Sequence, residues 1–339
     1  MTYQEVTKSP ELGVSSLSRP VASSSTDRRA IPAHAREGVW HAPDGHAVRR
    51  IDWHRDAGEP GRGSLLFVPG RGDCYEKYLE VLEGWHEAGW SVTSLDWRGQ
   101  ALSGRLGLDA TTGHVSDFAG WVEDLAAFAR EWRDQAAGPH VCVAHSMGGH
   151  IVLRAVAERK VSFRALVLTA PMLGMLPDRF PSRHLHALAR IISRLGDPRR
   201  PAWKSNETPV ALASRIELLT HDEARYADEA WWRETRPELA MGPASWGWIV
   251  AALASIRKLE APGVLEGVTV PVLIIATQAD RLVSWRAIAR AAARLPHAEL
   301  VAFGSEARHE ILREVDPVRT KALDAIAEFL DRVAPATSS

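Results

Sequence analysis

The stretch from His140 to Leu153, HVCVAHSMGGHIVL, constrains the fold of this chain more than any other. Its apolar run from Val141 to Ala144 predicts a buried strand, and an apolar pattern of helical period begins at Ile151. A strand that passes so quickly into a helix must turn sharply, and this turn places the Ser146 hydroxyl at its tip. The first N–H groups of the helix then point at whatever the serine attacks. A serine nucleophile needs such donors and a neighbouring base.

The same residues have a second interpretation. The usual form of this signature is G-x-S-x-G, and here Ala144 stands at the first glycine. Many helices simply begin with a serine cap. The segment A-H-S-M-G alone therefore does not separate a nucleophile from a helix cap, and the decision depends on partners further along the chain.

Short apolar runs alternate with helical patterns over most of the chain. Strands are predicted in a hairpin over 38–53 and at 64–69, 91–97, 141–144, 165–171, 271–277 and 298–304, and helices at 73–88, 117–135, 285–294 and in a last segment ending near 333. This alternation predicts an α/β fold with a mostly parallel, eight-stranded sheet and helices on both faces.

Two segments depart from the alternation. Residues 1–34 are rich in Ser, Thr and Arg and are predicted to be a disordered tail. Residues 173–259 contain helical patterns without a strand, and are predicted to form a cap inserted between the core segments 35–172 and 260–333. Such an insertion should lie over the carboxyl edge of the sheet, where ligands bind. Its tryptophans either line a substrate pocket or hold the cap's own core; the candidates for substrate contact are Trp203, Trp246 and Trp248, with Met172 and Leu173 at the cap entry.

Composition excludes several classes of function. With 339 residues, 45% hydrophobic residues and a net charge of -1, the chain is an ordinary globular sequence without the basic runs of a nucleic-acid-binding protein. Two cysteines, Cys74 and Cys142, are too few for a disulfide framework, and the first 30 residues hold no apolar signal or membrane segment. A cytoplasmic location is expected, and the oligomeric state stays open.

A glycine-flanked turn follows the strand that ends at Val68. Within Pro69–Asp73, PGRGD, the backbone N–H of Arg71 could form an oxyanion hole together with the N–H of Met147, although a plain turn would have the same sequence. The Arg71 side chain could also reach toward an acidic group. Gly70 in this turn, and His145 beside the serine, are further candidates for substrate contact.

Two more residues follow strands at the same predicted edge of the sheet. Asp280 lies just after the strand 271–277, where a carboxylate can orient a histidine and stabilise its imidazolium. His309 lies in the loop after the next strand, and histidine is the commonest general base near neutral pH. The order Ser146, Asp280, His309 is that of a hydrolase triad.

Several motifs together resemble a known family. They are FVPGRGDCYEKY, LDWRGQALSGR, GHVSDF, AHSMGGHIVLR, APMLG, TQADRLVS and ARHEILRE. From about Ala35 to Leu330 the chain resembles the α/β-hydrolases of the lysophospholipase and monoacylglycerol lipase group, the serine aminopeptidase S33 family. The resemblance implies Ser146 as nucleophile, Asp280 as acid, His309 as base, an oxyanion hole at Arg71 and Met147, a helical cap, and no metal or organic cofactor. The sequence departs from the family pattern at Pro69, Ala101 and Ala144.

Three functions remain in competition at this point. The first is a serine ester hydrolase for apolar acyl esters such as lysophospholipids or monoacylglycerols. The second is an aminopeptidase, which would need cap carboxylates to hold an ammonium group, and the third is a non-catalytic binding protein. The available carboxylates are Asp222, Glu223, Asp228, Glu229, Glu234 and Glu238.

Two further features of the cap bear on partners. His184 and His186 have no acidic companion at metal-ligand spacing, so they are interpreted as surface residues. If the substrate is a lipid, apolar residues at the cap entry could touch a membrane peripherally, although they could equally pack the hinge; they are Met172, Leu173, Met175, Leu176 and Phe180.

Overall fold

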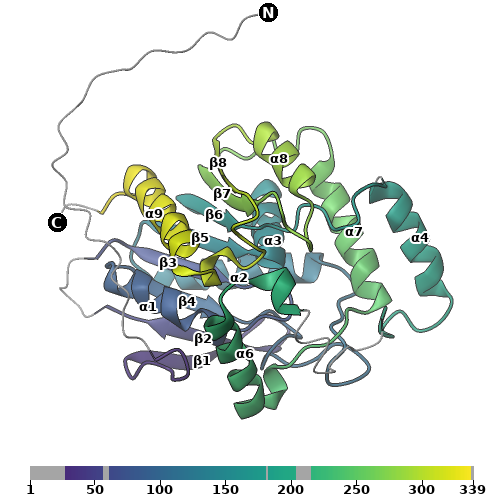
Figure 1. Cartoon of the computed structure of the whole chain (residues 1–339), viewed down its shortest axis with the longest axis horizontal. Coiled ribbons are helices and arrows are strands. Elements are labelled where there is room, and N and C mark those ends of the chain that lie inside the picture. The colour runs from purple at the N-terminus through teal and green to yellow at the C-terminus, as the bar shows by residue number, and fades with distance from the viewer. Residues whose placement is uncertain (1–26, 56–60, 181, 204–214, 337–339) are drawn as a thin grey trace, which may run out of the picture.

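The apolar runs form one eight-stranded sheet in a computed structural model that describes residues 27–55, 61–180, 182–203 and 215–336. The strand order is β1-β2-β4-β3-β5-β6-β7-β8 (Figure 1). The pairs β1–β2 and β2–β4 are antiparallel and all the others are parallel, which confirms the predicted sheet. The strands are β1 (Ala35–His41), β2 (Ala47–Trp53), β3 (Ser64–Val68), β4 (Ser91–Leu95), β5 (His140–His145), β6 (Ala165–Thr169), β7 (Val272–Thr277) and β8 (Ala298–Phe303).

The central strands are apolar throughout because helices cover both faces of the sheet. In β3, Leu65 and Phe67 point into one hydrophobic cluster, and Leu66 and Val68 point into the other. One face is covered by α1 (Leu79–Glu87) and α9 (Asp316–Val333), and the opposite face by α2 (Ala119–Gln135), α3 (Ser146–Ala157) and α8 (Trp285–Arg294) (Figure 1). The helix predicted over 73–88 begins as a 3-10 turn, η1 (Tyr75–Tyr78), and continues as α1.

The segment between β6 and β7 is helical where it is described. Its elements are α4 (Ser182–Arg194), α6 (Glu223–Thr235), η2 (Pro237–Leu239) and α7 (Trp246–Glu260). Helix α4 lies along α7, whereas α6 lies apart from them against η1 (Figure 1). Side-chain caps start two of these helices, because the Asp222 carboxylate accepts from the Arg225 N–H and the Ser245 hydroxyl from the Trp248 N–H.

The predicted N-terminal tail runs to residue 34, but its last residues lie against the body of the protein. The carboxylate of Asp228 in α6 accepts from Arg28 at 2.5 Å and from Arg29 at 2.7 Å. The indole of Trp232 donates to the Arg28 carbonyl at 2.9 Å. Arg28 and Arg29 thus form ion pairs with a buried carboxylate, which the sequence of the tail did not predict. Residues 1–26 of the predicted tail lie outside the described part of the chain.

Within the described ranges, no helix combines the length and the apolar character needed to cross a bilayer.

Candidate active site

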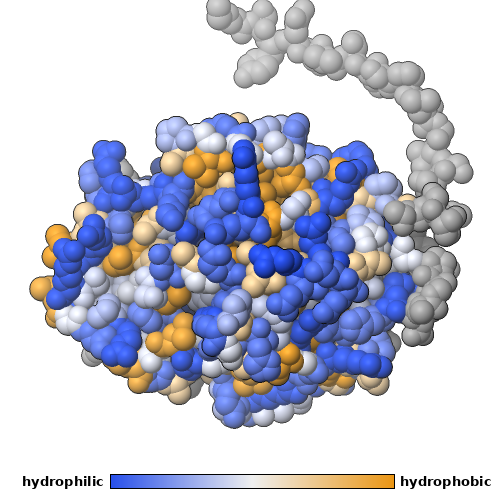
Figure 2. All heavy atoms as spheres, turned by 180° about the vertical axis from the view of Figure 1, so that it is seen from behind, coloured by the Kyte–Doolittle hydropathy of each residue, from blue (hydrophilic) through white to orange (hydrophobic). Residues whose placement is uncertain are grey.

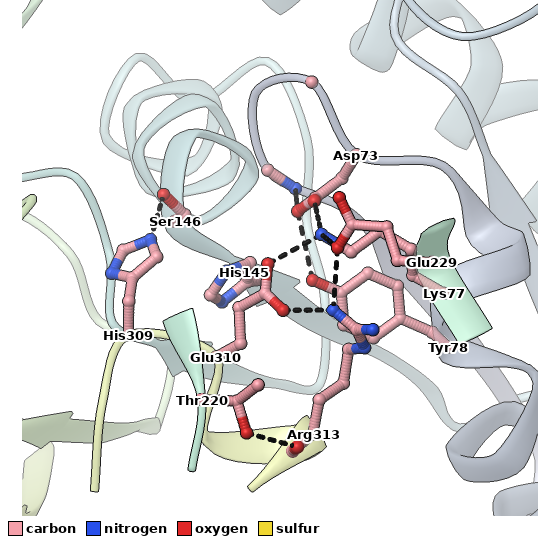
Figure 3. A network of polar contacts seen from close by, with 12 residues as sticks. Asp73, Lys77, Tyr78, His145, Ser146, Thr220, Glu229, His309, Glu310 and Arg313 are labelled. Atoms are coloured by element: carbon pink, nitrogen blue, oxygen red, sulfur yellow. Dashed lines mark hydrogen bonds and ion pairs between the residues drawn. The ribbon is translucent and has the colours of Figure 1, made fainter. Parts of the chain in front are cut away.

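Ser146 occupies the turn between β5 and α3. Its φ angle is +50°, a left-handed conformation that strains a residue with a side chain by roughly 1–3 kcal/mol. Buried packing of the strand and the helix holds the serine in this turn, and Ala144 before it is fully buried. The alanine at the first position of the signature is therefore accommodated. The Ser146 hydroxyl points toward the His309 ring (Figure 3).

The structure brings the three predicted triad residues together, although they lie far apart in the sequence. His309 Nε2 lies 2.9 Å from Ser146 Oγ, and His309 Nδ1 lies 2.7 Å from Asp280 Oδ2. The other carboxylate oxygen of Asp280 accepts from the N–H groups of Leu282 at 2.8 Å and Val283 at 3.0 Å. Because both oxygens are engaged, the carboxylate holds the imidazole in one orientation.

The environment separates the proton affinities of Asp280 and His309. Burial opposes ionisation of Asp280, but the adjacent imidazole and the hydrogen bonds to the carboxylate outweigh it, so the pKa of Asp280 is lowered. Burial likewise opposes protonation of His309, yet the Asp280 carboxylate raises the pKa of His309 above its ordinary value. His309 can therefore take a proton from a hydroxyl and be stabilised as an imidazolium, which is what a general base requires.

The turn after β3 approaches the nucleophile closely. The N–H groups of Gly70 and Gly72 donate to Asp73 Oδ2 at 3.0 Å and to Gln100 Oε1 at 2.7 Å. A Cβ on Gly70 would lie 2.8 Å from that carboxylate oxygen and 3.1 Å from Ser146 Cβ, so only glycine permits this approach. The carbonyl of Pro69 accepts from the Trp97 indole at 2.8 Å, which fixes the turn despite the unusual proline.

Two backbone donors remain for a substrate oxygen. Neither the Arg71 N–H in this turn nor the Met147 N–H in the first turn of α3 has an acceptor among the described residues. Helix starts leave such groups free. Met147 directly follows Ser146, and Arg71 follows Gly70, whose Cβ position would lie 3.1 Å from Ser146 Cβ, so both N–H groups belong to segments next to the serine.

A cavity of about 720 Å³ opens above Ser146 and His309, within the usual size range of small-molecule sites. Its walls are largely apolar and come from the region between β6 and β7 as well as from the core. Five of the predicted contact residues line it: His145, Met172, Trp203, Trp246 and Trp248. Gly70 borders the nucleophile without lining the cavity. Leu173 does not line it, and its side chain is part of the buried core cluster.

A buried network of charged side chains lies beside the triad (Figure 3). Lys77 Nζ contacts Asp73 in the turn after β3, Glu310 at 2.6 Å and Glu229 of α6 at 3.1 Å. Arg313 also binds Glu310 and lies 3.2 Å from Glu229. Because Glu310 directly follows His309, the network joins the turn 69–73, the His309 loop and α6. The sequence pattern did not single out Lys77 and Arg313 as part of the site. The only sign of such cations was that Asp73 and Glu310 lie close in sequence to the predicted site residues.

His145, next to the nucleophile, is fully enclosed by this region. Its ring centroid lies 4.9 Å from that of His309, and Nδ1 lies 3.2 Å from the Thr169 carbonyl and hydroxyl. Burial and the charge of His309 lower the pKa of His145 to about 4. A neutral His145 therefore adds no positive charge that would compete with protonation of His309.

The cap carboxylates that an aminopeptidase would need are engaged or exposed. Asp222 binds Arg225, Asp228 binds Arg28 and Arg29, and Glu229 belongs to the buried network; the others are exposed at the surface, namely Glu223, Glu234 and Glu238. None of the six lines the cavity. On α4, His186 accepts from Arg257 at 2.9 Å, and among the described residues no group of His, Cys, Asp and Glu side chains is arranged to hold a metal.

Comparison with known proteins places this geometry in context. The family model described as serine aminopeptidase, S33, matches residues 59–316. Lysophospholipase L2 of Escherichia coli strain K12 is 32% identical over 285 residues, which cover 79% of this chain and 80% of that protein. Monoacylglycerol lipase of Mycolicibacterium smegmatis is 28% identical over 135 residues, or 40% of this chain and 46% of that protein.

Solved structures show the same fold at low sequence identity. A soluble variant of monoglyceride lipase from Saccharomyces cerevisiae, in complex with a substrate analog, has a TM-score of 0.69 and 18% identity, covering 91% of this chain and 99% of the other. The monoacylglycerol lipase of Paleococcus ferrophilus has a TM-score of 0.64 and 22% identity, covering 84% and 98%.

Proposed function

Because the chain belongs to the serine aminopeptidase S33 family of α/β-hydrolases, we propose that it hydrolyses carboxylic esters of apolar acyl chains through an acyl-enzyme on Ser146. Its relatives support an ester-hydrolysing enzyme that acts on lipid esters. The observation that carries the serine mechanism is the hydrogen-bonded chain from Ser146 Oγ through His309 to Asp280, at 2.9 and 2.7 Å.

Each residue has one task in this mechanism. His309 Nε2 takes the hydroxyl proton while Ser146 Oγ bonds to the ester carbonyl carbon, and the N–H groups of Arg71 and Met147 donate hydrogen bonds to the oxyanion. Each such donor contributes about 2.7–4 kcal/mol to the transition state. The intermediate expels the alcohol, which receives the proton from His309. Water, activated by the same imidazole, then releases the fatty acid and regenerates Ser146.

Lysophospholipids, monoacylglycerols and similar acyl esters are the proposed substrates. An apolar cavity of about 720 Å³ can bury an acyl chain, and a relative that spans most of the chain is named a lysophospholipase. An aminopeptidase is the weaker proposal, because the candidate carboxylates for an ammonium group are held by arginines or lie outside the cavity.

A fluorophosphonate probe and a substrate panel test these proposals together. The probe should label the wild-type protein at Ser146, and p-nitrophenyl esters, monoacylglycerols and lysophosphatidylcholine of increasing chain length should be hydrolysed. Alanine and proline naphthylamides should react far more slowly. Absence of labelling would support a non-catalytic binding protein, and faster cleavage of the naphthylamides would support the aminopeptidase.

Peripheral membrane contact is proposed for α4 rather than for the cap entry as a whole. Met172 and Leu173 are buried, so they cannot touch a lipid surface. On α4 and beside it, large apolar side chains are exposed between arginines, as at the left edge of Figure 2. The exposed apolar residues are Phe180, Leu188, Ile191 and Leu195, and the arginines are Arg183, Arg190 and Arg194. This combination is typical of helices that lie on anionic membranes.

Sedimentation with lipid vesicles tests the α4 proposal. Wild-type protein should bind vesicles that contain phosphatidylglycerol better than vesicles of phosphatidylcholine alone, and Ile191→Glu should weaken this binding. Val39→Glu, at an apolar residue exposed on β1, is the matched control. Equal binding of all three proteins would contradict the proposal.

We further propose a cytoplasmic location, since Cys74 and Cys142 are buried free thiols.

A further inference from the structure

Arg71 lines the cavity, and among the described residues its side chain has no acidic partner. Its Nη2 donates to the Gly242 carbonyl at 2.9 Å, and its guanidinium lies 5.3 Å from the Trp248 ring centroid and 6.0 Å from that of Trp203. Its Nε is buried without a hydrogen-bond acceptor, and no carboxylate of the described residues forms an ion pair with it. The acidic group that the Arg71 side chain could reach is therefore not found within the described part of the chain.

The surroundings are shaped to hold this guanidinium. A Cβ on Gly113 would lie 2.8 Å from Arg71 Nη2 and 2.9 Å from Met241 Sδ, so any larger residue there would displace the arginine. Burial and the positive charge of Arg215 lower the pKa of Arg71 to about 10, which still leaves it protonated at neutral pH. A buried cation without a counter-ion is costly, and a bound anion would remove that cost.

Arg215 also lines the cavity, and its one ion pair among the described residues is long and shared. Its Nη2 lies 3.4 Å from Glu229 Oε1, whereas Arg233 lies 2.7 Å from the same oxygen. Glu229 also faces Lys77 at 3.1 Å and Arg313 at 3.2 Å. One carboxylate thus serves four cations, and Arg215 is the most weakly bound of them.

The acidic residues of the cavity wall do not offset these arginines. Asp73 accepts from Lys77, from the Tyr78 hydroxyl at 3.0 Å and from the Gly70 N–H. Glu310 accepts from Lys77 and Arg313. Both carboxylates are therefore paired with cations that do not line the cavity, although together with Glu229 they still raise the pKa of Arg215. In the described wall of the cavity, the arginines Arg71, Arg215 and Arg233 outnumber these two carboxylates.

We propose that Arg71 and Arg215 form an anion subsite that binds the phosphate of a phosphorylated glyceride while its ester lies over Ser146. Arginine binds phosphate through several donors at once. The backbone N–H of Arg71 is a proposed oxyanion donor. The side chain of the same residue therefore lies close to the ester bond that is cleaved. The subsite rests on the proposed ester hydrolysis and deepens it, because it selects lysophospholipids over uncharged monoacylglycerols.

The decisive experiment compares two substrates with the same acyl chain, lysophosphatidylglycerol and monoacylglycerol. The quantity measured is the ratio of their kcat/KM values, in wild type and in Arg71→Gln and Arg215→Gln. Each substitution should lower this ratio by about tenfold or more, as expected for the loss of one charge-assisted hydrogen bond to phosphate. Arg236→Gln is the matched control, since Arg236 binds Glu37 and Glu76 and does not line the cavity. A ratio within about twofold of wild type in both variants overturns the subsite, while hydrolysis itself continues.

A binding measurement keeps the subsite testable if turnover fails altogether. In Ser146→Ala protein, tryptophan fluorescence should report tighter binding of lysophosphatidylglycerol than of monoacylglycerol, and Arg71→Gln should remove the difference. Equal binding of both lipids overturns the subsite. Inorganic phosphate should compete with lysophosphatidylglycerol if the arginines recognise phosphate itself, and a lack of competition at concentrations that saturate other phosphate sites counts against them. Loss of all ester hydrolysis in wild type, with the binding difference intact, would instead reject the proposed function.

Discussion

Two buried serine–histidine pairs lie in the described part of this protein, and only one of them has a carboxylate. Ser146 and His309 are 2.9 Å apart, and Asp280 completes the first pair. In the second pair, Ser255 Oγ of α7 lies 2.6 Å from His150 Nε2 of α3 and accepts from Arg154 Nη1 at 2.9 Å. A short Ser–His contact is therefore not sufficient to define an active site.

The charged residue beside each pair, Asp280 or Arg154, shifts the pKa values of the two imidazoles in opposite directions. Asp280 overcomes the effect of burial and raises the pKa of His309. Burial and the charge of Arg154 lower the pKa of His150 to about 3. His309 can accept a proton and be stabilised as a cation, whereas His150 stays neutral and acts as a structural acceptor between two helices. The carboxylate thus distinguishes the proposed general base from a packing residue.

Replacement of Ser146 should have the largest effect on ester turnover, in contrast to replacement of Ser255. Ser146→Ala is expected to lower kcat for p-nitrophenyl esters by about 10⁶-fold, because the nucleophile of a triad acts as a unit with its base. The melting temperature should change little, since the strained turn loses only a hydroxyl. Steady-state kinetics and calorimetry on the purified variant measure both quantities. Turnover above about one hundredth of wild type would point to another nucleophile.

Asp280→Asn should have the next largest effect and make the first pair resemble the second. We expect a fall in kcat of about 10⁴-fold, as found when the orienting carboxylate of a triad is replaced. In wild type the base must be unprotonated, so kcat/KM should fall as the pH drops through the raised pKa of His309. In the variant this acid limb should move to lower pH. Asp44→Asn, which removes an exposed carboxylate bound to Arg98, is the control.

The sequence was sufficient to predict the first pair but carried no signal for the second. Ser146, Asp280 and His309 each follow a predicted strand, and strand ends of a parallel sheet meet at one edge. His150 and Ser255 lie within helices, so no rule of topology brings them together. Hydrophobic patterns gave the sheet for a related reason, because strands covered on both faces are continuous apolar runs.

The charged part of the site could not be predicted, because its contacts depend on tertiary packing. Lys77 meets Glu310 across 233 positions of sequence. Glu229 was considered only as one of several cap carboxylates that could hold a ligand, whereas the fold buries it among four cations. The sequence around Arg71 likewise gives no sign that its guanidinium lies near the rings of Trp203 and Trp248.

Ser255→Ala should affect stability and leave catalysis intact. The substitution deprives His150 and Arg154 of a buried hydrogen-bond partner, which should lower the free energy of unfolding by about 1–3 kcal/mol. Ester turnover should stay within about twofold of wild type, since Ser255 does not line the cavity. Urea unfolding followed by fluorescence gives the first quantity. A large loss of turnover in folded protein would assign the second pair a functional role.

The smallest effect is a difference in how stability depends on pH. The lowered pKa of His150 means that the unfolded chain binds a proton that the folded protein excludes as the pH falls from about 6.5 toward 3. This histidine therefore costs about 1.4 kcal/mol of stability for each pH unit within that window. His309, with its raised pKa, has the opposite sign: its contribution is present below pH 6.5 and is lost as the pH rises through its folded pKa. Relative to wild type, His150→Asn should gain stability between pH 6 and pH 5, and His309→Asn should lose more stability in acid than in alkali. Parallel shifts of both variants would contradict opposite roles for the two imidazoles.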